Sequence, residues 1–378
     1  MRLAYITASS FPNPKASAVQ VMQMCTAFAA AGVDTTLISR APDSPLPPAD
    51  LMAHYGLPLT FTLDQRPFPS GPLAAHRFQL DAARTLPPDT LCYARGRDLT
   101  APLVALWGGH TAAVEVHGRP ANRRERWMLR QIAHHPRGRL ITITEPLRDI
   151  YLHELGCPPS RVHVAPDGVD LQRFTPHRTI AEARAQLHLN PAARYVVYVG
   201  GLYDGRGLEE LFAAMRGLPA TLLIVGGRDA VEIARWQTRL AEYGLPPEQV
   251  IFAGYQPPAN VPAYLFAADI LAMPYSTRTR TPAGEDTTAF MSPLKMFEYL
   301  AAGRPIVASD LPALRTTLTH EHNALLAPPD DATALHAALA RLLADATLRD
   351  SLSTHARATA AHHSWLARAQ SILAHFTG

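Results

Sequence analysis

The sequence has almost no lysine. Only two of its 35 basic residues are lysines, Lys15 and Lys295, and the others are arginines. The base composition of a GC-rich gene accounts for the arginine excess, but it leaves the two remaining lysines to be explained. A lysine ammonium is a compact cation with rotatable donors, and it fits sites where the planar arginine fork does not. Both lysines lie beside turn residues, which suits a phosphate site, so both are candidate ligand-binding residues.

Cysteine and long apolar runs are also scarce. Cys25, Cys92 and Cys157 are scattered without paired spacing, which indicates neither a disulfide framework nor a zinc site. No stretch reaches the roughly 18 uninterrupted apolar residues of a membrane span. Residues 1–14 hold one basic residue and a short apolar run, which is typical of a first β-strand and not of a signal peptide. We therefore expect a cytoplasmic protein.

The length and the order of elements predict two α/β domains. A chain of 378 residues is too long for one ordinary hydrophobic core. Short apolar strands alternate with helical patterns, which predicts parallel sheets covered on both faces. Strands are expected at 3–7, 35–39, 91–94, 112–116, 140–144 and 162–165, and after a break at 195–201, 221–227, 250–254, 270–275, 305–309 and 324–328.

Helices and irregular segments fill the rest of this pattern. We expect helices at 17–31, from about 208, at 262–267 and after 330. The proline-rich segment 41–72 has no long periodic run, so it is expected to be an irregular excursion. In such sheets ligands bind beyond the carboxyl ends of the strands, so two facing units would hold a ligand in the cleft between them.

The loop after the first strand contains Lys15, Ala16 and Ser17. It has no Gly-x-Gly-x-x-Gly pattern, which disfavours a nicotinamide or flavin enzyme. The small residues would let a ligand approach the amides that open the following helix, although Ser17 would also serve as a plain helix N-cap. In the second half, Gly200–Gly207 reads GGLYDGRG, in which glycines surround a cation and make a diphosphate site plausible.

The densest group of polar residues lies in 291–310. Ser292 and Pro293 form a helix start, beyond which the first amides would receive an anion. Lys295 and Glu298 are three residues apart and share one helix face. Without a ligand-binding role they would be an ordinary surface ion pair worth a few tenths of a kcal/mol.

Four motifs in this order resemble one enzyme family. They are VEVHG, HVAPDGVD, YVGGLYDGRGLEEL and SPLKMFEYLAAGRPIVASD, and they span nearly the whole chain. With them the sequence resembles the GT-B glycosyltransferases of the large retaining GT4 class. The resemblance implies an α/β fold of two Rossmann-like domains whose parallel sheets face each other across a cleft. It also implies transfer of a hexose from a UDP- or GDP-type sugar, with retention of configuration and without metal or any other cofactor.

The same resemblance assigns roles to residues. Glu298 would hold the donor ribose, and His117 would lie near the transferred sugar. The diphosphate and sugar would be bound by Arg206, Ser292, Pro293, Leu294 and Lys295, the base by Gly226, Gly227, Gly254 and Tyr255, and the acceptor or a closure loop would involve Lys15, Ala16 and Ser17.

Two positions depart from the family pattern. Phe290 stands where the first glutamate of the E-x7-E element is expected, and Gly201 stands where many members have arginine. The lost glutamate normally contacts the sugar, and Glu285 or Asp286 could reach the same space. The lost arginine would leave Arg206 and Lys295 to neutralise the diphosphate.

The segment 119–139 contains seven arginines and one acidic residue, with apolar residues between them. Such a helix either lies on an anionic membrane or presents a solvated basic face while its apolar stripe packs on its own domain. We favour the second interpretation. No aromatic-rich basic platform accompanies the segment, so a nucleic-acid partner is not expected.

The domains are expected at 1–172, completed by a C-terminal helix at 362–378, and at 173–361. The first would be the acceptor side and the second the donor side, with a glycan, a lipid-linked molecule or a small molecule as acceptor. The alternatives are an inverting transferase or epimerase of the same fold, and a sugar-nucleotide-binding or regulatory protein with weak or no transferase activity.

Overall fold

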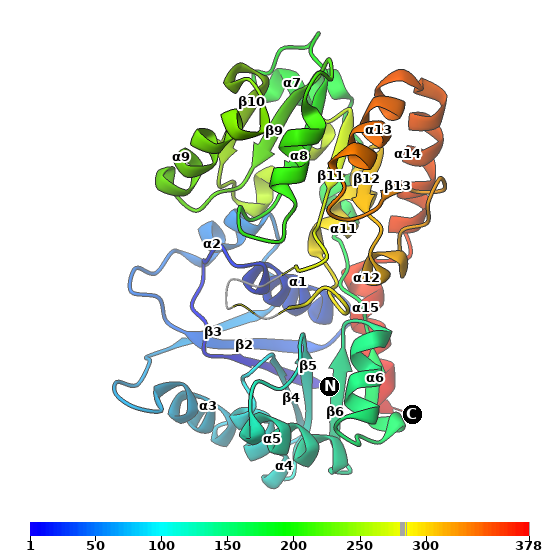
Figure 1. Ribbon diagram of the computed structural model, residues 1–378. Helices are drawn as coiled ribbons and strands as arrows, with labels where there is room; N and C mark the ends of the chain where they lie inside the picture. Colours follow the sequence, from blue (N-terminus) through cyan, green and yellow to red (C-terminus); the bar gives the residue numbers. More distant parts are fainter. Residues whose placement is uncertain (280–283, 285, 378) are drawn as a thin grey trace. The chain divides into compact units, whose positions relative to one another are not determined.

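The computed structural model describes residues 1–279, 284 and 286–377 and divides into two compact units. The first unit comprises Met1–Asp167 and Trp365–Gly378, and the second comprises Gly168–Ser364. These boundaries lie a few residues from those expected at 172/173 and 361/362. The final helix, α15 (Trp365–Thr377), therefore belongs to the first unit, where it packs against α1 (Ala16–Ala30) (Figure 1).

The first unit is a seven-stranded parallel sheet with helices. Its strand order is β3-β2-β1-β4-β5-β6-β7, and every neighbouring pair is parallel. Its elements are β1 Arg2–Thr7, α1 Ala16–Ala30, β2 Asp34–Arg40, α2 Pro48–Tyr55, β3 Thr62–Arg66, α3 Ala74–Arg84, β4 Thr90–Arg95, α4 Thr100–Trp107, β5 Thr111–Val116, α5 Arg123–His134, β6 Gly138–Thr142, α6 Glu145–His153, β7 Val162–Val164 and α15 Trp365–Thr377.

The second unit is a six-stranded parallel sheet with helices. Its strand order is β10-β9-β8-β11-β12-β13. Its elements are α7 Ile180–Gln186, β8 Tyr195–Val199, α8 Leu208–Met215, β9 Thr221–Val225, α9 Ala230–Arg239, β10 Val250–Gly254, α10 Val261–Phe266, β11 Ile270–Met273, α11 Leu294–Ala302, β12 Ile306–Ser309, α12 Pro312–Arg315, β13 Leu325–Ala327, α13 Ala332–Ala344 and α14 Ala346–Ala360.

The core of the second unit lies on both faces of its sheet. Along β8, Val197 and Val199 belong to the cluster that includes α10 and α11, while Val196 and Tyr198 belong to the cluster that includes α8 and α13. Side chains alternate between the faces of a strand, so a strand buried on both faces reads as the continuous apolar run seen in the sequence. The predicted two-sided coverage is confirmed for this unit.

Two local predictions were wrong, and one predicted strand is displaced by two residues. The segment 41–72 is not irregular, because it contains α2 and the edge strand β3. Four of the five residues of β3 are only partly buried and the first is exposed, so it lacks an apolar run. The strand expected at 140–144 ends at Thr142, because Thr144 accepts a hydrogen bond from the Leu147 N–H and caps α6. Ser17 is not the N-cap of α1, since that position is Lys15, which provides no side-chain cap.

Candidate functional site

Three loops of the second unit meet beyond the carboxyl ends of β8, β9 and β10. The Gly200 N–H donates to the Val225 carbonyl at 3.0 Å, and the Gly226 N–H donates to the Gly254 carbonyl at 2.9 Å. A Cβ on Gly226 would lie 1.9 Å from the Gly200 oxygen, so only glycine allows this approach. Gly227 directly follows Gly226. Tyr255 directly follows Gly254, and 40% of its surface is exposed. The structure thus brings together the glycines that the sequence assigned to the base.

Arg206 lies in the loop after β8 and is held between two aromatic rings. Its guanidinium carbon is 4.6 Å from the Tyr203 ring centroid and 4.7 Å from that of Tyr275, and it also donates to the Tyr203 hydroxyl. Its Nε is buried and has no hydrogen-bond partner among the described residues. A Cβ on Gly207 would lie 1.5 Å from the Pro274 oxygen, so the loop packs directly on the segment after β11. The cation is therefore fixed by packing.

The glycine at 201 is explained by the same stack. A Cβ there would lie 2.1 Å from the Tyr203 ring, so a larger residue would displace the tyrosine that packs on Arg206. An arginine at 201 and this arrangement of Tyr203 are therefore mutually exclusive. In this chain the cation of the loop is supplied by Arg206.

Helix α11 begins at Leu294, with Pro293 at the N-cap position and no side-chain cap. The first N–H groups of an α-helix have no partner within the helix, so this end suits an anion. Ser292 directly precedes it. The Tyr299 hydroxyl of α11 accepts from the Val199 N–H at 2.8 Å, which ties the helix to the end of β8. The diphosphate candidates of α11 are thus anchored to the strand that leads into the loop of Arg206.

Glu298 is a buried carboxylate with two cations. Its Oε2 lies 2.5 Å from Lys295 Nζ, and its Oε1 lies 3.7 Å from a terminal nitrogen of Arg173. Only 8% of the Glu298 side chain and 7% of the Arg173 side chain are exposed. Arg173 belongs to the 3-10 helix Leu171–Phe174 and also donates to the Pro258 carbonyl. The interpretation as an exposed surface pair is therefore wrong.

The position of the missing family glutamate is filled. Phe290 is 3% exposed and lies in the core at the turn before α11. Of the two acidic residues considered as replacements, Asp286 accepts from the N–H and hydroxyl of Thr288. Glu285 lies outside the described residues.

In the first unit, His117 follows β5 directly, as predicted. Its Nε2 is 2.5 Å from Glu115 Oε1, and its Nδ1 is 3.1 Å from a terminal nitrogen of Arg95. Burial and then the Arg95 charge lower the pKa of His117 to about 4, so the ring is neutral at pH 7. Burial alone would raise the pKa of Glu115, but Arg368 and His117 hold it well below its usual value.

The remaining candidates of the first unit lie on the loop after β1. Lys15 and Ala16 are exposed and Ser17 is half-buried. The Lys15 N–H donates to the Asn13 side chain at 3.1 Å. The three residues open α1 beyond the carboxyl edge of the first sheet, at the same edge as His117.

Two models of known protein families match the chain. Residues 17–173 match the family model described as Glycosyltransferase Family 4, and residues 193–345 match that of Glycosyl transferases group 1. Both models describe glycosyltransferases, and together they cover most of the chain. The chain therefore belongs to the group 1, Family 4 glycosyltransferases.

Two relatives are curated as glycosyltransferases. A D-inositol 3-phosphate glycosyltransferase of Jonesia denitrificans is 30% identical over 240 residues, which cover 59% of this chain and 53% of the relative. The putative colanic acid biosynthesis glycosyltransferase WcaL of Salmonella typhimurium is 30% identical over 203 residues, covering 52% and 46%. The chain thus matches about half the length of these relatives.

Solved structures show the same fold over the whole chain. Sucrose-phosphate synthase from Thermosynechococcus elongatus has a TM-score of 0.74 at 22% identity, covering 100% of this chain and 98% of that one. Anabaena Alr3699/HepE in complex with UDP-glucose has a TM-score of 0.74 at 16% identity, covering 100% and 99%. The fold of this glycosyltransferase family member is therefore GT-B.

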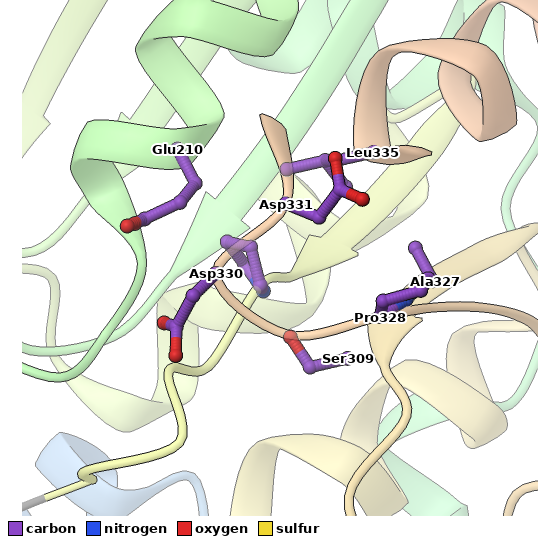
Figure 2. Close-up of a pocket in the computed structure, with 8 residues that line it drawn as sticks. Glu210, Ser309, Ala327, Pro328, Asp330, Asp331 and Leu335 are labelled. Carbon is purple, nitrogen blue, oxygen red and sulfur yellow. The ribbon is translucent and has the colours of Figure 1, made fainter. Parts of the chain in front are cut away.

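Figure 2 shows a small pocket elsewhere in the second unit. Its labelled lining residues are Glu210, Ser309, Ala327, Pro328, Asp330, Asp331 and Leu335. None of the donor-site candidates lines it. Burial and the neighbouring Asp330 raise the pKa of Glu210, and the acidic lining would repel a diphosphate. We assign no donor role to this pocket.

Sequence reasoning missed Glu115, Arg95, Arg368 and Arg173. Glu115 had a signal, because it is a charged residue inside the apolar run AAVEV. The arginines had none, since they are three residues among a large excess of arginine.

The basic segment 119–139 packs as the favoured interpretation predicts. Met128, Leu129, Ile132 and Ala133 of α5 are buried within the first unit, so the apolar stripe of this helix packs on its own domain. Among the described residues, no helix is both long and apolar enough to cross a bilayer.

Proposed function

We propose that this chain is a retaining, metal-independent hexosyltransferase that uses a UDP- or GDP-type sugar. The observation that carries the proposal is the convergence, within the second unit, of the glycine turns, the stacked Arg206 and the start of α11. Fixed cations and helix amides stabilise charge as it develops on a leaving diphosphate. Glu298 supplies a carboxylate for ribose hydroxyls. Anabaena HepE has the same fold, and its structures contain UDP or UDP-glucose. This similarity supports a UDP-type donor.

The first unit is proposed to supply His117 and the acceptor side. A neutral imidazole accepts a hydrogen bond from a sugar hydroxyl at one nitrogen while the other nitrogen donates. Lys15, Ala16 and Ser17 are proposed for the acceptor or for closure. The acceptor class is a glycan, a lipid-linked molecule or a small molecule.

A donor screen tests the function. We expect UDP or GDP, and the matching sugar nucleotide, to raise the melting temperature, because a ligand at 100 times its Kd stabilises by about 2.7 kcal/mol. With donor present we expect release of the nucleoside diphosphate and, with an acceptor, a product of retained configuration by NMR. Binding without release would indicate a regulatory protein, and isomerisation of the sugar would indicate an epimerase.

The variant Glu298→Gln tests whether Glu298 binds the ribose of the donor. Hydrogen bonds to a charged group contribute about 1.5–3 kcal/mol, so nucleoside diphosphate affinity should fall roughly 10- to 150-fold in calorimetry. The control is Glu248→Gln, which changes an exposed acidic residue of the same unit and should leave affinity unchanged. Equal affinity of the Glu298 variant and the control, with both folded by circular dichroism, would refute the ribose role.

Peripheral contact of the first unit with an anionic membrane is proposed for a lipid-linked acceptor. Trp127 of α5 is 51% exposed beside exposed arginines, and Trp107 at the end of α4 is 70% exposed. Interfacial tryptophan and arginine together favour anionic lipid surfaces. We expect the protein to sediment with phosphatidylglycerol vesicles but not phosphatidylcholine vesicles, and Trp107→Ser/Trp127→Ser to reduce this several-fold. Equal sedimentation of both proteins would exclude this surface.

A further inference from the structure

A buried carboxylate interrupts the apolar strand β5. Glu115 is fully buried, and four side chains approach its two oxygens. Gln20 Nε2 donates at 2.6 Å, the Tyr93 hydroxyl donates at 2.7 Å, and His117 Nε2 lies at 2.5 Å. Two terminal nitrogens of Arg368 lie 3.0 Å from the two oxygens, in a two-point ion pair. Donors to both oxygens and a paired cation favour the ionised form of this carboxyl group.

The hydrogen-bonding chemistry of its neighbours fixes the tautomer of His117. An ionised carboxylate only accepts, so Nε2 of His117 must carry a hydrogen and donate it to Glu115. A guanidinium only donates, so Nδ1 of His117 must be unprotonated and accept from Arg95. Both contacts are satisfied by a single neutral tautomer, in which Nδ1 is the acceptor.

Arg368 provides the charge that holds this arrangement. It lies on α15, and only 3% of its side chain is exposed. Beyond Glu115 it donates to the carbonyls of Ala165 and Pro166, which follow β7, at 2.8–3.2 Å. These bonds leave the guanidinium one orientation, with its fork on Glu115. Without it, burial would favour a protonated Glu115, which no longer accepts at both oxygens.

We propose that Arg368 is a positioning residue for His117. Through its ion pair it keeps Glu115 ionised, and Glu115 holds His117 as the neutral Nε2–H tautomer with Nδ1 as hydrogen-bond acceptor. A substrate hydroxyl that reaches His117 would thus bind at Nδ1, in exchange with Arg95. Only this last consequence rests on the proposed function, because the tautomer follows from the side chains alone.

Nitrogen NMR of histidine tests the proposal without substrate. In protein with ¹⁵N-labelled histidine, the His117 signals are identified by their loss in His117→Gln. We expect protonated Nε2 and unprotonated Nδ1 in the wild type at pH 7. Because Arg95 alone would keep Nδ1 unprotonated, the comparison is made in Arg95→Met, where we expect Glu115 and Arg368 to keep His117 in the Nε2–H form. In Arg95→Met/Glu115→Gln/Arg368→Met, a glutamine amide can either accept from Nε2 or donate to it, and we expect the Nδ1–H form to appear. Arg95→Met/Arg368→Lys keeps a cation beside Glu115 and should retain the Nε2–H form.

The outcomes separate this inference from the proposed function. Glu145→Gln, an exposed change on α6, is the control and should leave the His117 signals unchanged. A wild-type His117 that carries a hydrogen on Nδ1, or a triple variant that shows only the Nε2–H form, would overturn the inference whether or not the protein transfers sugar. In the active enzyme we expect Glu115→Gln/Arg368→Met to lose at least about tenfold in kcat with donor KM unchanged, and Arg368→Lys to keep most of the wild-type kcat. An enzyme with no activity would leave the NMR result standing.

Discussion

Replacing Arg368 by methionine should lower the free energy of unfolding of the first unit by about 3–5 kcal/mol, because it leaves a buried charge without its partner. Glu115 is fully buried and Arg368 is its cation. The remaining donors, Gln20, Tyr93 and His117, are neutral and do not replace a full charge. The same change also removes three hydrogen bonds to the carbonyls of Ala165 and Pro166.

Hydrogen exchange of the β4 and β5 amides is the appropriate measurement. A chain of two units need not unfold in one step, so a single melting temperature would mix the two. Glu115→Gln/Arg368→Met should cost less than Arg368→Met, since removing both charges leaves none unpaired. If the β5 amides exchange as slowly in Arg368→Met as in the wild type, the ion pair does not stabilise this strand.

This ion pair shows what the sequence could not reveal. Glu115 and Arg368 are 253 positions apart, and nothing in the local pattern of either residue points to the other. The same holds for Arg173, which meets Glu298 from a segment 125 residues away, although the Lys295–Glu298 contact follows from helical spacing alone. Contacts set by periodicity within one element are predictable, whereas contacts set by the packing of distant elements are not.

The strands also fall into those that the sequence predicts and those that it does not. Buried strands such as β8 and β9 are continuous apolar runs and were predicted within two residues of their ends. The edge strand β3, with the sequence TLDQR, has no such run and was missed. Its place in the sheet is set by pairing with β2 and not by its own hydrophobicity.

The largest effect on turnover is expected for Lys295→Ala in the second unit. If Lys295 neutralises the diphosphate in place of an arginine at 201, its charge is worth more in the transition state than in the ground state, because the leaving phosphate gains charge. Loss of one such donor costs roughly 10²- to 10³-fold in kcat, so donor KM should change much less. Lys295 is paired with Glu298 in the ligand-free molecule, so it would have to turn from the carboxylate toward the phosphate when donor binds.

Arg206→Ala should act in the same direction, and the double variant should fall short of additivity if both cations serve one phosphate group. Arg341→Ala, which removes an exposed cation paired with Glu321 on the same unit, is the matched control and should keep wild-type kinetics. Steady-state kcat and KM with a matched donor decide the matter. Wild-type kcat in Lys295→Ala would mean that this lysine serves only to neutralise the buried Glu298, and the phosphate role would then rest on Arg206 and the amides of α11 alone.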